Sequence, residues 1–391
     1  MRPSTLSEDQ DKVVHAPFTL FPTTISESNL QLATQSMVHF NRLMHHVAMD
    51  HQLLQESFKH IIDVDEFTER LWNIYMAVWN DERVQPVWFG LFRNDFLLDE
   101  DPDTSKLQLK QVEMNTIAAG FGGVGSKLAD FYRYILDLIG VEYTYNQIPD
   151  SQSVYGFASG FVNAWGMYGN PKGKEEVGVV YYRVGYAPTD YTDKIWTIRI
   201  ELEKAWCIKC PPIQYQLVGA KKIQQVLTKP GILDKYISDI SIKQLIQSTF
   251  VGQYSLDMGE EGDKALNMAV SNPDQFVLKP QREGGGNNLY GEEMKEFLLS
   301  IATCSERSAY ILMDRIYSKP QLNSIVKTGV PFTKLNCVSE LGIFGCFIGA
   351  KDKELYNISC GHMWRTKLAD TDEGGVSAGF GGLDFPFFNI P

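Results

Sequence analysis

The feature that most constrains this sequence is the stretch from residue 276 to residue 290. A β-favouring run ends in Lys279, Glu283 follows, and three glycines come before two amides, Asn287 and Asn288. A strand can present a fixed lysine to phosphate oxygens, a carboxylate can hold Mg²⁺, and glycines let backbone N–H groups approach phosphates. A tight turn is the alternative, but one glycine would serve it, and three cost backbone entropy. The stretch therefore predicts a nucleoside triphosphate site.

The spacing of this stretch does not fit the two best-known phosphate-binding patterns. No Gly-Lys-Ser/Thr follows a first glycine, so it is not a Walker loop, and it lacks the Rossmann arrangement of glycines. We therefore expect a different nucleotide-binding fold.

Composition narrows the class of protein. The chain has 391 residues, which indicates two or three domains, and its 44% hydrophobic content suffices for a large core. A net charge of −12 argues against a nucleic-acid binder. No run of 18 apolar residues exists, so we expect no membrane span. The first fourteen residues lack an apolar segment, so no secretory signal is expected, although a secreted mature form could have lost one.

The cysteines and histidines indicate neither disulfides nor a metal centre. Six cysteines are scattered through the chain, which is typical of cytoplasmic thiols, and Cys207-x-x-Cys210 lacks the second pair that zinc would need. Five histidines between residues 39 and 60 lack the spacing of a metal site, so we interpret them as surface or core residues.

Periodicity predicts a mixed α/β protein. Apolar stripes predict helices around residues 37–47 and 67–78, and β-rich runs predict strands at 87–91, 107–115, 276–279, 310–316, 335–341 and 343–348. Glu113 and Asn115 are two apart on a predicted strand, so both should point to one face. We expect residues 120–125 to form a loop, and Gly342, between the last two strands, to mark a bulge or tight bend.

Several motifs together resemble one family. They are Glu113-Met114-Asn115, the 279–288 motif, Met313–Ile316, Ser339-Glu340-Leu341-Gly342, and Gly361–Lys367 followed by Gly374-Gly375. The sequence 17–22 and the motif 257–263 match as well. This set resembles eukaryotic glutathione synthetases over nearly the whole chain.

The resemblance implies an ATP-grasp fold, in which mixed and antiparallel sheets clamp ATP. It implies ligation of γ-glutamylcysteine to glycine through an acyl phosphate, with ATP and Mg²⁺ required and a homodimer as the usual assembly. The domains expected are residues 1–156, with Glu113 and Asn115; 157–225, which bind substrate; and 226–391, which carry the Gly-rich loops.

The resemblance also implies roles for individual residues. Glu113, Asn115 and Glu283 resemble Mg²⁺ ligands, and Arg365 and Lys279 resemble catalytic residues. The residues implied to bind the nucleotide are Glu113, Lys221, Lys279, Gly284, Gly285, Gly286, Asn287, Asn288, Tyr290, Met313, Ile316, Glu340, Lys367 and Glu373. The residues implied to contact the peptide are Arg93, Ala118, Ala119, Gly120, Arg183, Tyr186, Arg365, Val376 and Ser377.

For each arginine the alternative is an ordinary ion pair. Arg93, for example, lies two residues before Asp95. For Met313 the alternative, a buried strand residue, is compatible with an apolar adenine pocket.

Two departures from the family pattern stand out. The family commonly has serines where this chain has Ala118 and Gly120, and losing two hydroxyls removes hydrogen bonds worth about 0.5–1.5 kcal/mol each. In addition, the match jumps by several tens of residues between Lys172 and Gly173. Deleting strands would expose sheet edges, so we favour a mobile lobe that the sequence closes up, with a deletion from the gene as the alternative.

These departures leave alternatives to a working synthetase. One is a relative with lost catalysis that keeps nucleotide binding, and another is a ligase for an acceptor other than glycine.

Overall fold

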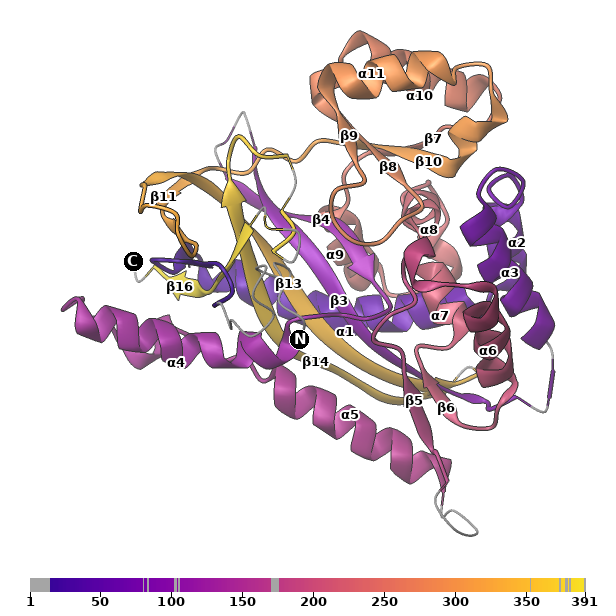
Figure 1. The fold of residues 1–391 in the computed structure, drawn as a ribbon, viewed down its shortest axis with the longest axis horizontal. Coiled ribbons are helices and arrows are strands. Elements are labelled where there is room, and N and C mark those ends of the chain that lie inside the picture. Colours follow the sequence, from indigo (N-terminus) through magenta and orange to yellow (C-terminus); the bar gives the residue numbers. More distant parts are fainter. Residues whose placement is uncertain are drawn as a thin grey trace.

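The protein is a mixed α/β structure, as the sequence predicts, and its described residues form two larger sheets and two two-stranded ones, β16-β2 and β5-β6 (Figure 1). The computed structural model describes residues 15–389 except 80, 83, 102, 103, 105, 170–175, 352, 373, 377, 378 and 380. No helix in these residues is both long and apolar enough to cross a bilayer.

The larger sheet has eight strands in the order β12-β1-β15-β14-β13-β3-β4, with β11 paired to β13. Its centre is antiparallel, and β1 pairs in parallel with β15, so segments from both ends of the chain lie side by side. The strands are β1 (Phe18–Thr19), β3 (Val87–Glu100), β4 (Leu107–Asn115), β11 (Gln321–Asn323), β12 (Ile325–Val326), β13 (Leu335–Ala350), β14 (Lys353–Leu368) and β15 (Gly381–Asp384).

Helices cover both faces of this sheet. Because side chains alternate along a strand, Leu341 and Ile343 of β13 enter the cluster that contains α1 (Glu27–Met49), whereas Phe344 and Cys346 enter the cluster beside α5 (Ser153–Tyr168). Figure 1 shows α5 and α4 (Gly122–Leu138) running along the lower side of the sheet. The two-sided burial explains why β13 is apolar over most of its length.

The smaller sheet is antiparallel and has the order β7-β10-β8-β9. Helices α10 and α11 pack on it at the top of Figure 1, around a core that includes Leu278 and Leu312. Its elements are β7 (Gln253–Ser255), β8 (Phe276–Pro280), β9 (Leu289–Tyr290), β10 (Tyr310–Asp314), α10 (Glu260–Ser271) and α11 (Gly291–Ser300).

Short helices join the two sheets. All seven residues of α8 (Lys221–Leu227) are buried, including both lysines, and the helix contacts β4 of the large sheet and β7 and β10 of the small one. The remaining elements are β2 (Thr23–Ile25), β16 (Pro386–Phe388), β5 (Val179–Tyr181), β6 (Ile208–Cys210), α2 (His51–Phe58), α3 (Glu66–Val78), α6 (Asp193–Lys204), α7 (Ile213–Val218), α9 (Ile240–Thr249), η1 (Tyr145–Gln147), η2 (Pro188–Asp190), η3 (Leu233–Lys235), η4 (Pro273–Gln275) and η5 (Ser305–Ala309).

Two local predictions are wrong. Gly342 is neither a bulge nor a bend, because β13 is one strand and Gly342 pairs in register with Asp95 and Met363. The irregularity lies next to it, between Ile343 and Gly345. The predicted loop over residues 120–125 is shorter, because α4 begins at Gly122 behind Phe121, which has a φ of 71°.

The structure tests neither the predicted gap after Lys172 nor the predicted domain boundaries. The junction between Lys172 and Gly173 lies outside the described residues. The domain boundaries stay a prediction, and the large sheet takes strands from both the first and the last proposed domain.

Two glycines allow α5 to lie directly on the large sheet. A Cβ at Gly156 would lie 2.0 Å from Cys360 Cβ, and one at Gly160 would lie 2.4 Å from Cys346 Sγ. The helix backbone therefore rests on β13 and β14 at these positions.

We expect Gly156→Ala to lower the free energy of unfolding by about 1–3 kcal/mol, because the added methyl overpacks this contact. Gly166→Ala is the matched control. It lies in the same helix with nothing within 4 Å of its Cβ position, and should raise stability by about 0.5–1 kcal/mol through helix propensity. Urea unfolding of both variants checks this, and equal effects would contradict the packing argument.

Candidate active site

A polar patch lies on the same face of the large sheet as α5. It consists of Arg93 and Asp95 on β3 and Glu113 and Asn115 on β4. On β3, Phe89 and Leu91 pack in the cluster beside α5, and the alternation then brings Arg93 and Asp95 to the same face. Asn115 pairs opposite Arg93 and Glu113 opposite Asp95. The predicted common direction of Glu113 and Asn115 thus follows from the strand, and pairing adds β3 residues beside them.

A cavity of about 290 Å³ lies between this patch and the small sheet. Val277 and Lys279 from β8 and Met313 from β10 form its other wall. The predicted residues that line it are Arg93, Glu113, Asn115, Lys279, Gly284, Gly285, Asn288, Tyr290, Met313, Ile316, Glu340, Arg365 and Lys367.

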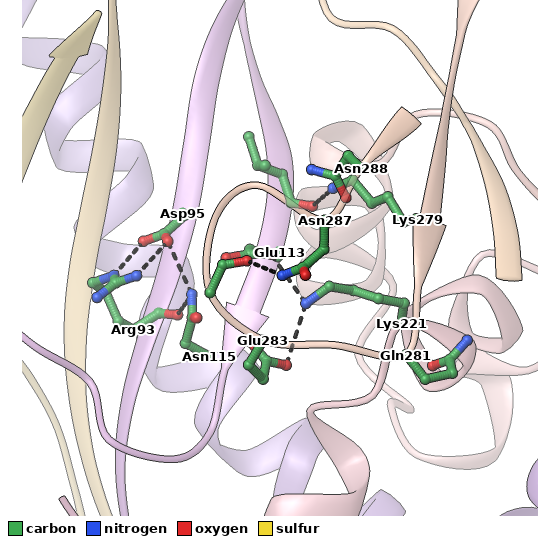
Figure 2. Close-up of polar contacts among 12 residues, drawn as sticks. Arg93, Asp95, Glu113, Asn115, Lys221, Lys279, Gln281, Glu283, Asn287 and Asn288 are labelled. Carbon is green, nitrogen blue, oxygen red and sulfur yellow. Dashed lines mark hydrogen bonds and ion pairs between the residues drawn. The ribbon is translucent and has the colours of Figure 1, made fainter. Parts of the chain in front are cut away.

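Lys221 joins two carboxylates that are far apart in the sequence. Its Nζ lies 3.0 Å from Glu113 Oε2 and 3.2 Å from Glu283 Oε1, and its side chain is only 4% exposed (Figure 2). Helix α8 supplies the lysine, β4 supplies Glu113, and the segment after β8 supplies Glu283. The structure therefore places both predicted metal-ligand carboxylates around one cation.

The electrostatics of this triad are asymmetric. Burial would raise the pKa of Glu113, but Lys221 and Lys279 outweigh it and hold that pKa well below its usual range. Burial raises the pKa of Glu283 to about 7, opposed by Lys221 and reinforced by the Glu113 charge. Burial would lower the pKa of Lys221, but the two carboxylates raise it above its ordinary value. Lys221 is therefore held in its charged form, and Glu283 is the member of the triad whose pKa lies near neutrality.

Asp95 organises the other half of the patch, and its role was missed from the sequence. It accepts two hydrogen bonds from the Arg93 guanidinium, at 2.7 and 2.8 Å, and one from the Asn115 amide at 2.9 Å (Figure 2). A fourth hydrogen bond comes from Arg365 at 2.8 Å. The signal was available, since Arg93 and Asp95 are two apart on a strand. It indicated only an ion pair, and cross-strand pairing brings the other donors.

Arg365 is shared between two acidic groups. Besides Asp95 it binds Glu340, its partner on β13, so the predicted ribose acceptor is engaged with an arginine. Burial would lower the pKa of Arg365, but Glu340 and Asp95 raise it. The guanidinium is therefore a fixed positive charge on the cavity wall.

The Gly-rich segment is anchored on one side. Arg282 binds Asp65, the N-cap residue of α3, with Nη1 to Oδ2 at 2.8 Å. After Glu283 come Gly284 and Gly286, with φ of 89° and 90°, which L side chains rarely adopt. Asn287 closes the turn by donating to the Gly284 carbonyl at 3.1 Å.

The other predicted cations bind backbone carbonyls. Lys279 Nζ donates to the Val112 carbonyl at 2.9 Å, and Lys367 Nζ donates to the Asp372 carbonyl at 2.5 Å. These bonds tie the small sheet to β4 and the end of β14 to the segment after it.

Of the predicted peptide contacts, Arg93 and Arg365 line the cavity, and Arg183 lies against residues 118–120. Arg183 Nη1 is 3.5 Å from the Ala118 carbonyl, and a Cβ at Gly120 would lie 3.3 Å from Arg183 Nη2. Ala118 has a φ of 52°, which is unusual for a non-glycine residue. Ala119 is buried in the cluster beside α5.

Val376, another predicted peptide contact, is buried beside α4. The predicted residues Glu373 and Ser377 lie outside the described residues.

A second residue missed from the sequence, Asp190, holds the segment between Arg183 and Tyr186. Its Oδ2 accepts the backbone N–H groups of Gly185, Tyr186 and Ala187 at 2.9, 3.1 and 3.1 Å. A turn-forming Pro-x-Asp at residues 188–190 was the available signal. Tyr186 lies close to the Gly-rich segment, 3.9 Å from the Cβ position of Gly284.

The donor set fits Mg²⁺ by its chemistry. Two carboxylates already share an ammonium ion, and the amide nitrogen of Asn115 is bound to Asp95, which turns its oxygen away from Asp95. Oxygen donors of this kind are those that Mg²⁺ prefers. Within the described residues no group of three His, Cys, Asp or Glu side chains could hold a metal ion.

The chain matches known proteins along nearly its whole length. The model of the eukaryotic glutathione synthase ATP-binding domain matches residues 1–388. The glutathione synthetase of Xenopus laevis is 36% identical over 441 residues, covering 99% of this chain and 93% of the relative. The chloroplastic glutathione synthetase of Arabidopsis thaliana is 33% identical, covering 95% of this chain and 78% of the relative.

A solved structure shares the fold. A glutathione synthetase-like effector from Globodera pallida, in its apo form, aligns with a TM-score of 0.72 and 22% identity, covering 96% of this chain and 91% of that one.

The alignment lengths agree with a missing segment. The match to the Xenopus laevis relative runs over 441 residues, more than the 391 of this chain, so part of the relative has no counterpart here.

The raised pKa of Glu283 predicts a pH-dependent stability. Between its ordinary value of 4.5 and about 7, the folded protein keeps a proton that the unfolded chain has lost, so this group makes stability fall as pH rises through that window. Glu283→Gln removes the effect. Without divalent ions, its free energy of unfolding relative to the unsubstituted protein should therefore increase from about pH 5 to about pH 8.

Denaturant unfolding across this pH range measures the difference. Glu293→Gln, on the exposed side of α11, is the matched control and should show a constant difference. A pH-independent difference for Glu283→Gln would contradict the assignment.

Proposed function

Since the chain belongs to the family of eukaryotic glutathione synthetases, we propose that it ligates γ-glutamylcysteine to glycine and converts ATP to ADP and phosphate. The observation that carries this proposal is the convergence of Glu113 and Glu283 on one cation, at a cavity wall that also holds Lys279 and Arg365. A triphosphate and its metal require this combination of acidic and basic groups.

The reaction follows from the chemistry of carboxylates. The cysteinyl carboxylate attacks the γ-phosphorus of ATP, ADP leaves, and an acyl phosphate forms. The glycine amine then attacks the acyl carbon, loses a proton and displaces phosphate. Phosphorylation is needed because a carboxylate is a poor electrophile, and the protein contributes alignment and charge neutralisation.

In this proposal the nucleotide occupies the cavity between the sheets. Lys221 and Lys279 neutralise phosphate charge, and the segment 284–288 with Tyr290 encloses the phosphates. Met313 and Ile316 contact adenine, and Glu340 accepts from ribose hydroxyls after exchanging its bond to Arg365. Lys367 and Glu373 complete the nucleotide set. The cavity lining supports these roles, except for Lys221, Gly286, Asn287 and Glu373, which rest on the resemblance.

Glu113, Asn115 and Glu283 are proposed to hold Mg²⁺. The ion would supply charge neutralisation and a fixed orientation for the phosphates. The support is the oxygen donor set described above, with two carboxylates already facing one cation.

Arginines are proposed to bind the peptide. Arg93, Arg183 and Arg365 present guanidinium groups for carboxylates, and Arg365 and Lys279 stabilise the charge that develops during phosphoryl transfer. Tyr186, residues 118–120, Val376 and Ser377 complete the set by resemblance. We also propose a homodimer, by resemblance alone, and a cytoplasmic location, which is consistent with six unpaired cysteines.

Release of ADP tests the proposal. Purified protein given γ-glutamylcysteine, glycine, ATP and Mg²⁺ should release ADP and form glutathione. ADP release that requires the dipeptide but a different amine would establish the alternative acceptor, and no dipeptide-dependent release would refute the ligase assignment.

A matched pair of variants localises the activity. Glu113→Gln keeps the size of the side chain but removes the charge that faces Lys221, so kcat should fall by about 100-fold or more. Glu56→Gln, at an exposed i,i+3 pair with Lys59, should leave kcat within about two-fold. Equal kcat values for both variants would place the reaction elsewhere.

A further inference from the structure

The buried carboxylate of Asp95 lies at hydrogen-bond distance from three residues that the proposed function assigns to metal or peptide binding. Asp95 is 0% exposed, so substrate cannot reach it without displacing its neighbours. Among the described residues its two oxygens accept four hydrogen bonds, from Arg93, Asn115 and Arg365. All three donors are residues to which the proposed function gives a direct contact with metal or peptide.

We propose that Asp95 is a positioning residue that sets both the amide orientation of Asn115 and the directions of the Arg93 and Arg365 guanidinium groups. This inference rests on the proposed function, and it adds a residue that takes no part in contacting the ligands.

The effect on Asn115 follows from the two ends of an amide. The group offers an NH₂ donor on one side and an oxygen acceptor on the other, and only the oxygen can bind Mg²⁺. Asp95 Oδ2 accepts from Asn115 Nδ2 at 2.9 Å, and the Arg93 carbonyl lies 3.5 Å from the same nitrogen (Figure 2). Two acceptors on that side make the flipped amide unfavourable, because its oxygen would then face them. The oxygen is therefore directed to the open side.

The effect on the arginines follows from shared charge. Arg93 binds Asp95 through Nε and Nη2, the paired geometry that fixes a guanidinium plane. Arg365 reaches the same carboxylate with Nη2, and its side chain is 17% exposed at the cavity. Two guanidinium groups so close together would repel each other without a negative charge between them. Asp95 supplies that charge, and Glu340 balances the second arginine from the other side.

Gly342 provides independent support. It pairs opposite Asp95, and a Cβ there would lie 2.8 Å from Asp95 Oδ1 and 2.9 Å from Arg93 Cδ. Gly342 has no left-handed φ, so space and not backbone conformation calls for glycine. The missing side chain at Gly342 therefore leaves room for the Arg93–Asp95 pair beside strand β13.

The test compares two buried aspartates in one sheet. Asp95→Asn should raise the dissociation constant for Mg²⁺, titrated by calorimetry into protein saturated with a non-hydrolysable ATP analogue, by about 10-fold or more. It should also raise KM for γ-glutamylcysteine about 10-fold, while KM for ATP changes by less than about three-fold. Asp384→Asn is the control. Asp384 is also 0% exposed but accepts from Thr23 and Thr366, so only the melting temperature should fall.

A second variant reaches the same network without changing charge. Gly342→Ala pushes on Asp95 and Arg93 and should shift Mg²⁺ binding and the dipeptide KM in the same direction as Asp95→Asn. It carries the test if Asp95→Asn does not fold.

The outcomes separate the two proposals. If Asp95→Asn and Gly342→Ala bind Mg²⁺ and dipeptide like the unsubstituted protein and only melt earlier, Asp95 is structural and the inference is overturned. If the unsubstituted protein binds Mg²⁺ with the analogue but makes no glutathione, the proposed function fails, and the Mg²⁺ measurement still decides the role of Asp95. If it binds no Mg²⁺ at all, both proposals fall.

Discussion

The site depends on one buried ammonium group. Lys221 lies between Glu113 and Glu283, and each of these three groups would be costly to bury alone. Removing one member of such a buried set typically costs about 3–5 kcal/mol, because the remaining charges lose their partner. The triad also holds α8 against β4 and against the segment after β8. The same contact therefore neutralises the site and fixes the relative position of the two sheets at the cavity.

One face of strand β3 contributes to both the core and the candidate site, because every second side chain of a strand points to the same side. Along β3 the same face is apolar at Phe89 and Leu91, which pack beside α5, and charged at Arg93 and Asp95, where the sheet reaches the cavity. The sheet is thus continuous, and its side chains change from apolar to charged where it borders the cavity. The charged groups are held by neighbours on adjacent strands, so the sheet keeps them in fixed positions.

Local patterns predicted much of this structure. The strand over residues 107–115, the helices that contain Met37 and Phe67, and the mixed α/β class follow from periodicity and are confirmed. The stretch 276–290 indicated a lysine, a carboxylate and glycines that allow close approach of the backbone, in this order. Lys279 and two of the glycines line the cavity, and Glu283 contacts Lys221.

Features that depend on residues distant in the sequence could not be predicted from local patterns. Gly342 was predicted to be a bend because its own segment does not show that Asp95 and Met363 pair with it on the adjacent strands. Asp95 looked like the partner of one arginine for the same reason. The short helix α8 has the composition of an exposed helix, with two lysines and two glutamines. Its lysines can be buried because carboxylates from other segments bind them, and the sequence of the helix does not reveal those partners.

The anchoring of Arg282 has a mechanical consequence. Its bond to Asp65 fixes the chain just before Glu283, whereas residues 284–286 are glycines with wide rotational freedom. Glu283 thus lies between the anchored residue Arg282 and a segment of three glycines. Rotation about the bonds of these glycines can therefore change the direction of the chain toward Tyr290 while Glu283 stays beside Lys221.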